Sequence, residues 1–193
     1  MQFQRKIILA SQSPRRKQLL EWAEIPFEVM VSDADESFPA AMPVGEIATF
    51  IARQKAQAIY HQYEEAKHAI IIAADTIVVI DGQVLGKPVD EKDACRMIEL
   101  LQGKAHEVIT GVVILHPQKT IEFADCTTVN FHPLSKEQIN FYIKKYQPFD
   151  KAGSYAIQEW IGVVGIQSIQ GDFYNVMGLP VSRVVQSLMQ LPA

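Results

Sequence analysis

The segment that most restricts the fold of this chain is residues 69–80, AIIIAADTIVVI, which Asp81 and Gly82 follow directly. A run this rich in isoleucine and valine predicts a strand. An Asp-Gly pair favours a two-residue type I′ turn, so the chain should return beside this strand through QVLGKP. The sequence therefore predicts a β-hairpin in the middle of the chain.

One charged side chain, Asp75, interrupts that strand. Alternation along a strand places it on the face of Ala73 and Ile77, and it places Thr76 on the opposite face. A carboxylate in such surroundings is costly unless it is paired, bound to a metal or protonated. We therefore interpret Asp75 as a functional residue; the alternative is that it caps backbone amides at a bend in the strand.

The N-terminal segment, residues 6–23, has the pattern of a strand, a serine-rich turn and a helix. Ser13 is expected to be the N-cap and Pro14 the first helical residue. The first turn of a helix attracts anions, and Arg15 and Arg16 would add two guanidinium groups that match phosphate oxygens. This pattern predicts a phosphate site, although basic residues at a helix start can also serve solubility alone.

A long helix is expected at residues 44–66, after a segment, residues 27–39, that begins as a strand and becomes an acidic loop containing Glu36. Lys55 lies four residues after Ile51, on the apolar face of that helix. It is either a functional cation or a lysine whose stem covers the rim of the core while its amine reaches solvent.

The remaining patterns complete a mixed α/β chain without an internal repeat. Ser135 and Gln138 have the spacing of a capping box, and the glycine-bearing residues 150–162 are interpreted as a binding loop. The other expected elements are helices at residues 90–102 and 135–145, strands at 105–115, 120–131 and 163–170, and a final helix that opens at Pro180.

Composition limits the classes of protein to consider. The 193 residues favour a single domain, residues 1–193, and 48% hydrophobic with 21% charged residues is typical of a globular chain. The net charge of −4 argues against long nucleic acids as partners. No apolar stretch is long enough to span a bilayer and no signal peptide is evident, so we expect a cytoplasmic protein.

Several common catalytic motifs are absent from the sequence, including the Walker A loop, the dinucleotide turn, the HExxH zinc pair and the nucleophile elbow. The two cysteines and five histidines lack the spacing of metal ligands. The remaining charged residues fit metal-assisted attack of water on phosphorus. In such a site, cations neutralise the phosphate oxygens, and carboxylates hold a divalent ion and activate the water. The residues concerned are Arg15, Arg16, Lys55, Lys87, Glu36 and Asp75.

The chain also resembles the Maf family of nucleoside triphosphate pyrophosphatases, once described as septum formation inhibitors. The resemblance runs nearly from end to end, in the same order. It is carried by LASQSPRR at the start, DADE at residues 33–36, RQKA at 53–56, AADTIV at 73–78, GKP at 86–88, TGV at 110–112, KAGSYAIQ at 151–158 and NVMGLP at 175–180.

The resemblance implies a mixed central β-sheet flanked by helices, in two lobes around a central cleft, which is the Maf or inosine triphosphatase-like fold. It also implies cleavage between the α and β phosphates, with Mg²⁺ or Mn²⁺ as cofactor, and by analogy a homodimer. Asp75 would be the proton acceptor, and Glu36 and Asp75 the metal ligands. The implied phosphate-binding residues are Ser11, Arg15, Arg16, Lys55 and Lys87.

Within the family, the chain is similar to the branch that acts on dTTP and UTP, with modified pyrimidine triphosphates as further candidates. Arg15, Thr76 and Gln158 match its specificity positions, and an amide such as Gln158 offers a pyrimidine edge both a donor and an acceptor. The pair Glu159-Trp160, directly after Gln158, departs from the family pattern, in which a glycine is common. Two alternatives stay open: the 7-methyl-GTP branch, and a regulator of cell division that binds a nucleotide without hydrolysing it.

Overall fold

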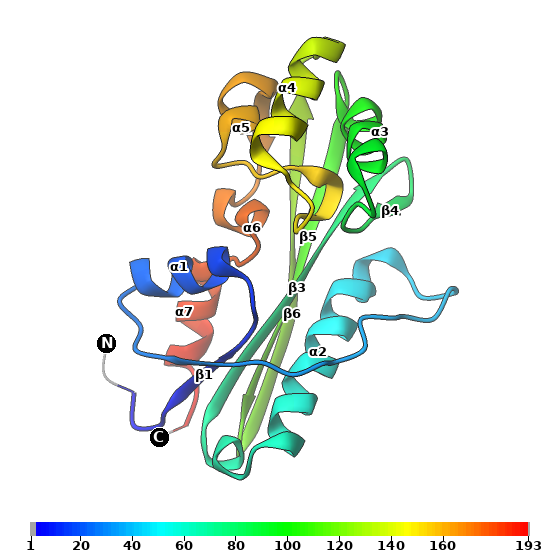
Figure 1. Cartoon of the computed structure of the whole chain (residues 1–193). Helices are drawn as coiled ribbons and strands as arrows, with labels where there is room; N and C mark the ends of the chain where they lie inside the picture. The colour runs from blue at the N-terminus through cyan, green and yellow to red at the C-terminus, as the bar shows by residue number, and fades with distance from the viewer. Residues whose placement is uncertain (1–2, 193) are drawn as a thin grey trace. The chain divides into compact units, whose positions relative to one another are not determined.

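The computed structural model describes residues 3–192 (Figure 1). The chain forms two compact units, and each is described by itself. The first contains the described residues up to Asp75, together with Thr110–Asp125 and the residues from Gly178 onward. The second contains Thr76–Ile109 and Cys126–Met177.

A mixed β-sheet supplies strands to both units. β1 pairs in parallel with β2 and β3, whereas β4 pairs antiparallel with β3, and β7 antiparallel with β6. The path through the sheet is β2-β1-β3-β5-β6-β7, with β4 beside β3 and off this path. The strands are β1 (Ile7–Ala10), β2 (Glu28–Met30), β3 (Ile70–Ile80), β4 (Gln83–Leu85), β5 (Ala105–His116), β6 (Lys119–Phe131) and β7 (Ile166–Gln170).

Helices flank the sheet in each unit, which confirms the predicted mixed α/β class (Figure 1). The first unit contains α1 (Pro14–Trp22), α2 (Val44–Gln62), the 3-10 helix η1 (Glu64–His68) and α7 (Val181–Met189). The second contains α3 (Glu91–Leu101), α4 (Lys136–Tyr146), the 3-10 helix η2 (Ala152–Ser154), α5 (Trp160–Gly165) and α6 (Phe173–Met177).

Each unit has an apolar cluster of its own. In the first, α2 packs on the sheet through Ala52 and Ile59 against Ile71 and Val113. In the second, side chains of α3 and α4 pack on β5 and β6 around Tyr142, which is fully buried. Burial of this apolar surface is the main stabilising contribution in each unit.

The local predictions that depend on neighbouring residues are confirmed. Ser13 caps α1, Pro14 is its first residue, and Ser135 and Gln138 form both bonds of a capping box. Asp81 and Gly82 have φ angles of 49° and 76°, as a type I′ turn requires, and β3 and β4 are the two strands of the predicted hairpin.

The helix predicted at residues 44–66 is four residues too long. α2 ends at Gln62, and Tyr63 is extended, with φ −120° and ψ 121°. The Tyr63 hydroxyl donates a hydrogen bond to the Val31 carbonyl, 3.3 Å away, and its ring packs against the core. These contacts to a distant segment hold Tyr63 out of the helix, and η1 follows it.

The C-terminal predictions need several corrections. The strand predicted at residues 163–170 begins only at Ile166, because Trp160–Gly165 forms α5, and a short apolar run does not distinguish a strand from a buried helix. The same helix occupies the end of the predicted binding loop. The short helix α6 was not predicted, and Pro180 is the N-cap of α7 rather than its first residue.

Within residues 3–192, no helix combines the length and the apolar character that crossing a membrane demands.

Candidate active site

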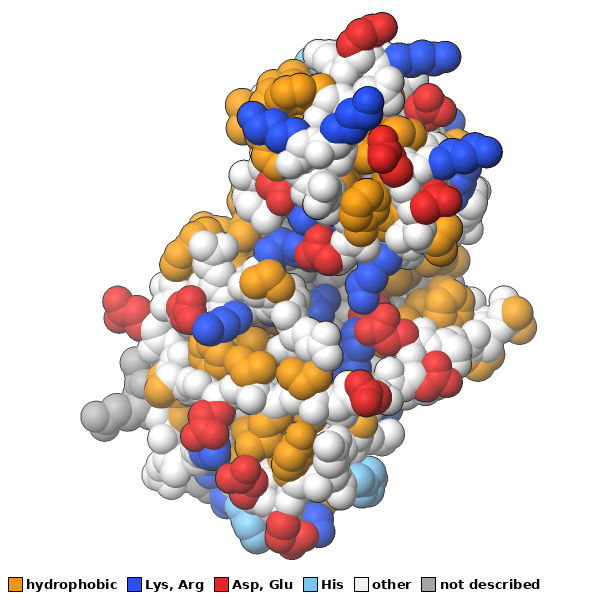
Figure 2. All heavy atoms as spheres, in the orientation of Figure 1, with side chains coloured by type: hydrophobic (Ala, Val, Ile, Leu, Met, Phe, Trp, Pro, Cys, Tyr) orange, Lys and Arg blue, Asp and Glu red, His pale blue; other side chains and the backbone are white. Residues whose placement is uncertain are grey.

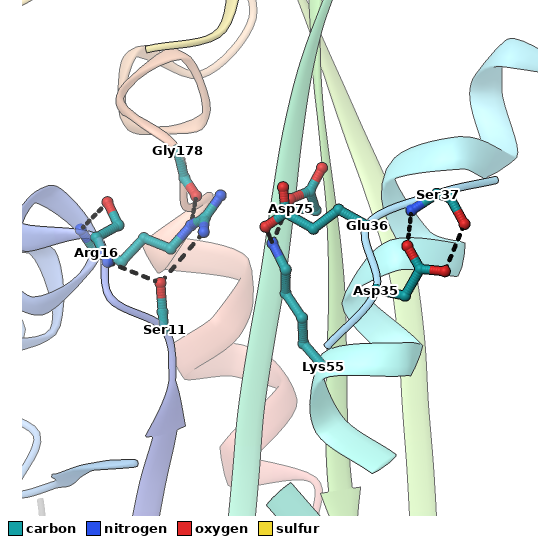
Figure 3. Close-up of polar contacts among 9 residues, drawn as sticks. Ser11, Arg16, Asp35, Glu36, Ser37, Lys55, Asp75 and Gly178 are labelled. Carbon is teal, nitrogen blue, oxygen red and sulfur yellow. Dashed lines mark hydrogen bonds and ion pairs between the residues drawn. The ribbon is translucent and has the colours of Figure 1, made fainter. Parts of the chain in front are cut away.

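Three predicted site residues meet in the first unit around one ammonium group. Lys55 Nζ lies 2.6 Å from Asp75 Oδ1 and 2.8 Å from Glu36 Oε1 (Figure 3). The side chains of Lys55 and Asp75 are 14% and 13% exposed, whereas that of Glu36 is 50% exposed. Lys55 comes from α2, Asp75 from β3 and Glu36 from the acidic loop, so three segments distant in sequence build this cluster.

The start of α1 supplies a second group of polar contacts. The Ser13 cap begins the helix so that Arg15 and Arg16 fall in its first turn, and the Arg16 N–H donates to Ser13 Oγ. The guanidinium of Arg16 donates through Nε to the Gly178 carbonyl at 2.7 Å, and through its terminal nitrogen to Ser11 Oγ at 3.3 Å (Figure 3). Arg16 is therefore a buried cation that two other segments hold.

Electrostatics link these two groups of contacts. Burial lowers the pKa of the Arg16 guanidinium, because desolvation disfavours its charged form. The negative charges of Asp75 and Glu36 oppose that shift, and the positive charge of Arg15 adds to it. Acidic and basic side chains of the first unit thus act on one another within one neighbourhood, as a site for a phosphate and a divalent cation requires.

The acidic loop divides its carboxylates between two tasks. Asp35 accepts hydrogen bonds from the backbone N–H and the hydroxyl of Ser37, at 2.8 and 2.7 Å, and both bonds lower its pKa. Glu36 instead reaches the Lys55 ammonium (Figure 3). Contact with Lys55 therefore distinguishes Glu36 from Asp35, which the DADE sequence alone does not do.

The predicted site residues are divided between the two units. Ser11, Arg15, Arg16, Glu36, Lys55 and Asp75 belong to the first unit. Thr76 directly follows Asp75 in β3, Lys87 lies exposed between β4 and α3, and Gln158 lies exposed before α5, all in the second unit. Sequence reasoning assigned no part to the Gly178 carbonyl, although NVMGLP contains it, because a backbone acceptor has no residue-type signature.

The carboxylates of the cluster suit a divalent cation that a phosphate chain helps to bind. In residues 3–192, no three His, Cys, Asp or Glu residues lie together as a complete metal site. Mg²⁺ is commonly held by one or two carboxylates together with substrate phosphates, so Glu36 and Asp75 form an adequate donor set.

Figure 2 shows acidic and basic side chains interspersed on the visible face, without the broad basic area that a long nucleic acid favours.

The comparison with protein families decides the membership of the chain. A family model described as "Maf-like protein" matches residues 6–191. The chain belongs to the Maf family. The family resemblance inferred from the sequence is thereby confirmed.

Several Maf relatives carry the name dTTP/UTP pyrophosphatase. One from Porphyromonas gingivalis is 46% identical over 184 residues, which cover 95% of this chain and 92% of the relative. One from Cytophaga hutchinsonii is 49% identical, covering 96% and 84%, and one from Bacillus cereus is 48% identical, covering 96% and 95%. Among solved structures, the Staphylococcus aureus Ham1 protein matches with a TM-score of 0.48 and 14% identity, covering 94% of this chain and 99% of that one.

Proposed function

We propose that this Maf protein hydrolyses dTTP and UTP to the nucleoside monophosphate and pyrophosphate. The names of its relatives support the substrate. The observation that carries the chemistry is the ion-paired cluster of Lys55, Asp75 and Glu36, in the same unit as the buried Arg16. Modified pyrimidine triphosphates are further candidate substrates.

Asp75 is the proton acceptor in this proposal. Lys55 holds Oδ1 of the carboxylate at 2.6 Å, which fixes the side chain that would accept a proton from the attacking water. The water oxygen bonds to the α-phosphorus while the bond to the α–β bridging oxygen breaks, so pyrophosphate leaves. The proton that the water loses stays on Asp75 until product release.

The cations bind the triphosphate. Ser11, Arg15 and Arg16 come from the turn and the first helical turn, where backbone N–H groups also attract an anion. Lys55 and Lys87 complete the phosphate-binding set in this proposal. Mg²⁺ or Mn²⁺, held by Glu36 and Asp75, would supply charge that offsets the negative phosphate oxygens.

Base choice is assigned to Arg15, Thr76 and Gln158. The Gln158 amide would donate to and accept from the pyrimidine edge, and this pairing disfavours bases with a different pattern. A small-molecule nucleotide is the partner that this proposal requires; the homodimer and the cytoplasmic location stay predictions from the sequence.

Product analysis tests the proposal. Purified protein with Mg²⁺ is offered dTTP, UTP, CTP, dGTP, ATP and 7-methyl-GTP, and we expect pyrophosphate and monophosphate, fastest from dTTP and UTP. The Asp75→Asn variant should lose about 100-fold or more in kcat, because general-base catalysis typically contributes that much. Asp35→Asn is the matched control, since this carboxylate of the acidic loop is bonded to Ser37 and should be dispensable.

Other products would identify the competing functions. Orthophosphate with a diphosphate would contradict the cleavage position. Preference for 7-methyl-GTP would assign the chain to the other branch of the family. Nucleotide binding without any product would favour a regulator over an enzyme.

A further inference from the structure

The turn that carries Gln158 is closed and anchored at both ends. The Glu159 N–H donates to the Ala156 carbonyl at 3.1 Å, so residues 156–159 form a four-residue turn. Ala156 and Ile157 are buried, at 4% and 6% exposure, whereas Gln158 is exposed. The backbone is held in the second unit while the amide side chain faces outward.

One hydroxyl group bonds to the first and the last residue of this turn. Tyr142, from α4, accepts a hydrogen bond from the Ala156 N–H at 3.2 Å and donates one to Glu159 Oε2 at 2.7 Å. The Tyr142 hydroxyl thus links the entry and the exit of the turn directly. A hydrogen bond to a carboxylate is stronger than one between neutral groups, so the exit bond contributes most.

The ring of Tyr142 is itself held in place by its neighbours. Tyr142 has no exposed surface, and its ring stacks on Tyr146 and on Trp160, with centroids 5.1 and 6.4 Å away. Trp160 directly follows Glu159, the last residue of the turn. Tyr142 therefore contacts Ala156 at the start of the turn and Trp160 just after its end.

The second carboxylate oxygen of Glu159 also has a fixed neighbour. It lies 3.5 Å from the ammonium of Lys151, a buried side chain that also pairs with Asp150 at 2.7 Å. Opposite charge therefore holds Glu159 from the side that Tyr142 does not reach. Both oxygens of this carboxylate are engaged, which restricts its rotation.

We propose that Tyr142 is a positioning residue for base recognition, acting through the turn that presents Gln158. This inference rests on the proposed function, in which Gln158 contacts the base. An amide distinguishes bases only while its carbonyl and NH₂ keep one orientation, and a loose turn spends binding energy on becoming ordered. Without the Tyr142 hydroxyl the turn keeps its own backbone bond and the Lys151 contact but loses the direct link between its first and last residues, and base selectivity falls.

The test compares Tyr142→Phe with Tyr146→Phe. The first removes the hydroxyl and keeps the stacked ring, whereas the second removes a neighbouring hydroxyl for which the described residues show no hydrogen bond. In Tyr142→Phe we expect amide hydrogen exchange in residues 155–159 to rise about tenfold, which corresponds to a loss of about 1.4 kcal/mol in the free energy of opening the turn. Tyr146→Phe should exchange as the wild type does.

Kinetics provide the functional readout. The ratio of kcat/KM for dTTP to that for CTP should fall about tenfold in Tyr142→Phe, through KM, while kcat changes less than about twofold. Glu159→Ala, which removes the acceptor at the exit of the turn, should act in the same direction and replaces Tyr142→Phe if that variant does not fold. Glu159→Gln keeps an oxygen for the hydroxyl and should restore most of the selectivity.

Two negative results have different meanings. Wild-type exchange and selectivity in Tyr142→Phe overturn this inference, while pyrophosphate release by the wild type still supports the proposed function. A wild-type protein that releases no pyrophosphate from any nucleotide overturns the function and, with it, the role in base recognition.

Discussion

At the scale of single residues, burial distinguishes ion pairs of the same length. Lys55–Asp75 and Lys67–Glu64 both measure 2.6 Å, but the first pair is about 14% and 13% exposed and the second 38% and 83%. Exposed pairs contribute little, whereas removing one partner of a shielded pair leaves a charge without compensation. We therefore expect loss of the Lys55–Asp75 pair, rather than loss of the Lys67–Glu64 pair, to lower the stability of the protein.

Lys55→Met tests this difference. We expect it to lower the free energy of unfolding by about 1–3 kcal/mol, less than for a fully buried pair because some solvent reaches the site. Lys67→Met is the control and should leave stability nearly unchanged. Both variants are compared by urea unfolding, and equal effects would contradict the argument from burial.

At the scale of secondary-structure elements, a close approach between α2 and β5 fixes the helix that carries Lys55. A Cβ built on Gly111 would lie 2.1 Å from the Thr49 nitrogen and 2.3 Å from the Ala48 carbonyl carbon. These are backbone atoms, which cannot turn aside as a side chain could. Gly111 thus permits the spacing at which Ala52 and Ile59 reach the core of the first unit.

Gly111→Ala should push α2 away from the sheet. Overpacking typically costs about 1–3 kcal/mol, and a clash with backbone belongs at the upper end. Activity should fall together with stability, because Lys55 moves with the helix. Gly45→Ala, near the start of the same helix, should be neutral or slightly stabilising, because beyond its chain neighbours and the nearby backbone of the helix no atom lies within 4 Å of the added methyl group. Thermal unfolding of the two variants gives the comparison, and equal melting temperatures would refute the close-approach argument.

At the scale of the whole molecule, the two units are not independent in sequence. β3, β5 and β6 each have residues in both units. Unfolding one unit would therefore remove parts of strands whose other parts belong to the second unit. We expect a single cooperative unfolding transition for this reason.

A bound nucleotide should raise the midpoint temperature of that single unfolding transition. With a non-hydrolysable α,β-imido analogue of dTTP at about 100 times its Kd, mass action adds about 2.7 kcal/mol. For a chain of this size, that corresponds to a rise in Tm of about 5–10 °C. The shift should need Mg²⁺ and vanish on addition of EDTA. An equal shift in EDTA would contradict the role of Glu36 and Asp75 as metal ligands.

Much of the fold and part of the site could be predicted from residues near one another in the chain. Ser13 and Pro14 set the start of α1, and Asp81 with Gly82 sets the hairpin, because caps and tight turns depend on a few adjacent residues. Asp75 was singled out because a carboxylate in an apolar strand is costly wherever the strand lies. The end of α2 was missed because a contact to Val31 determines it.

Residue type and short spacing are enough to specify which side chains carry charge, where α1 and α4 begin and where the chain turns at Asp81 and Gly82. Long-range packing determines that Glu36 rather than Asp35 reaches Lys55, that the Gly178 carbonyl holds Arg16, and that the Tyr142 hydroxyl links the two ends of the Gln158 turn. Each of these contacts joins groups through space, so the partner of each group depends on how distant segments pack rather than on the residues beside it.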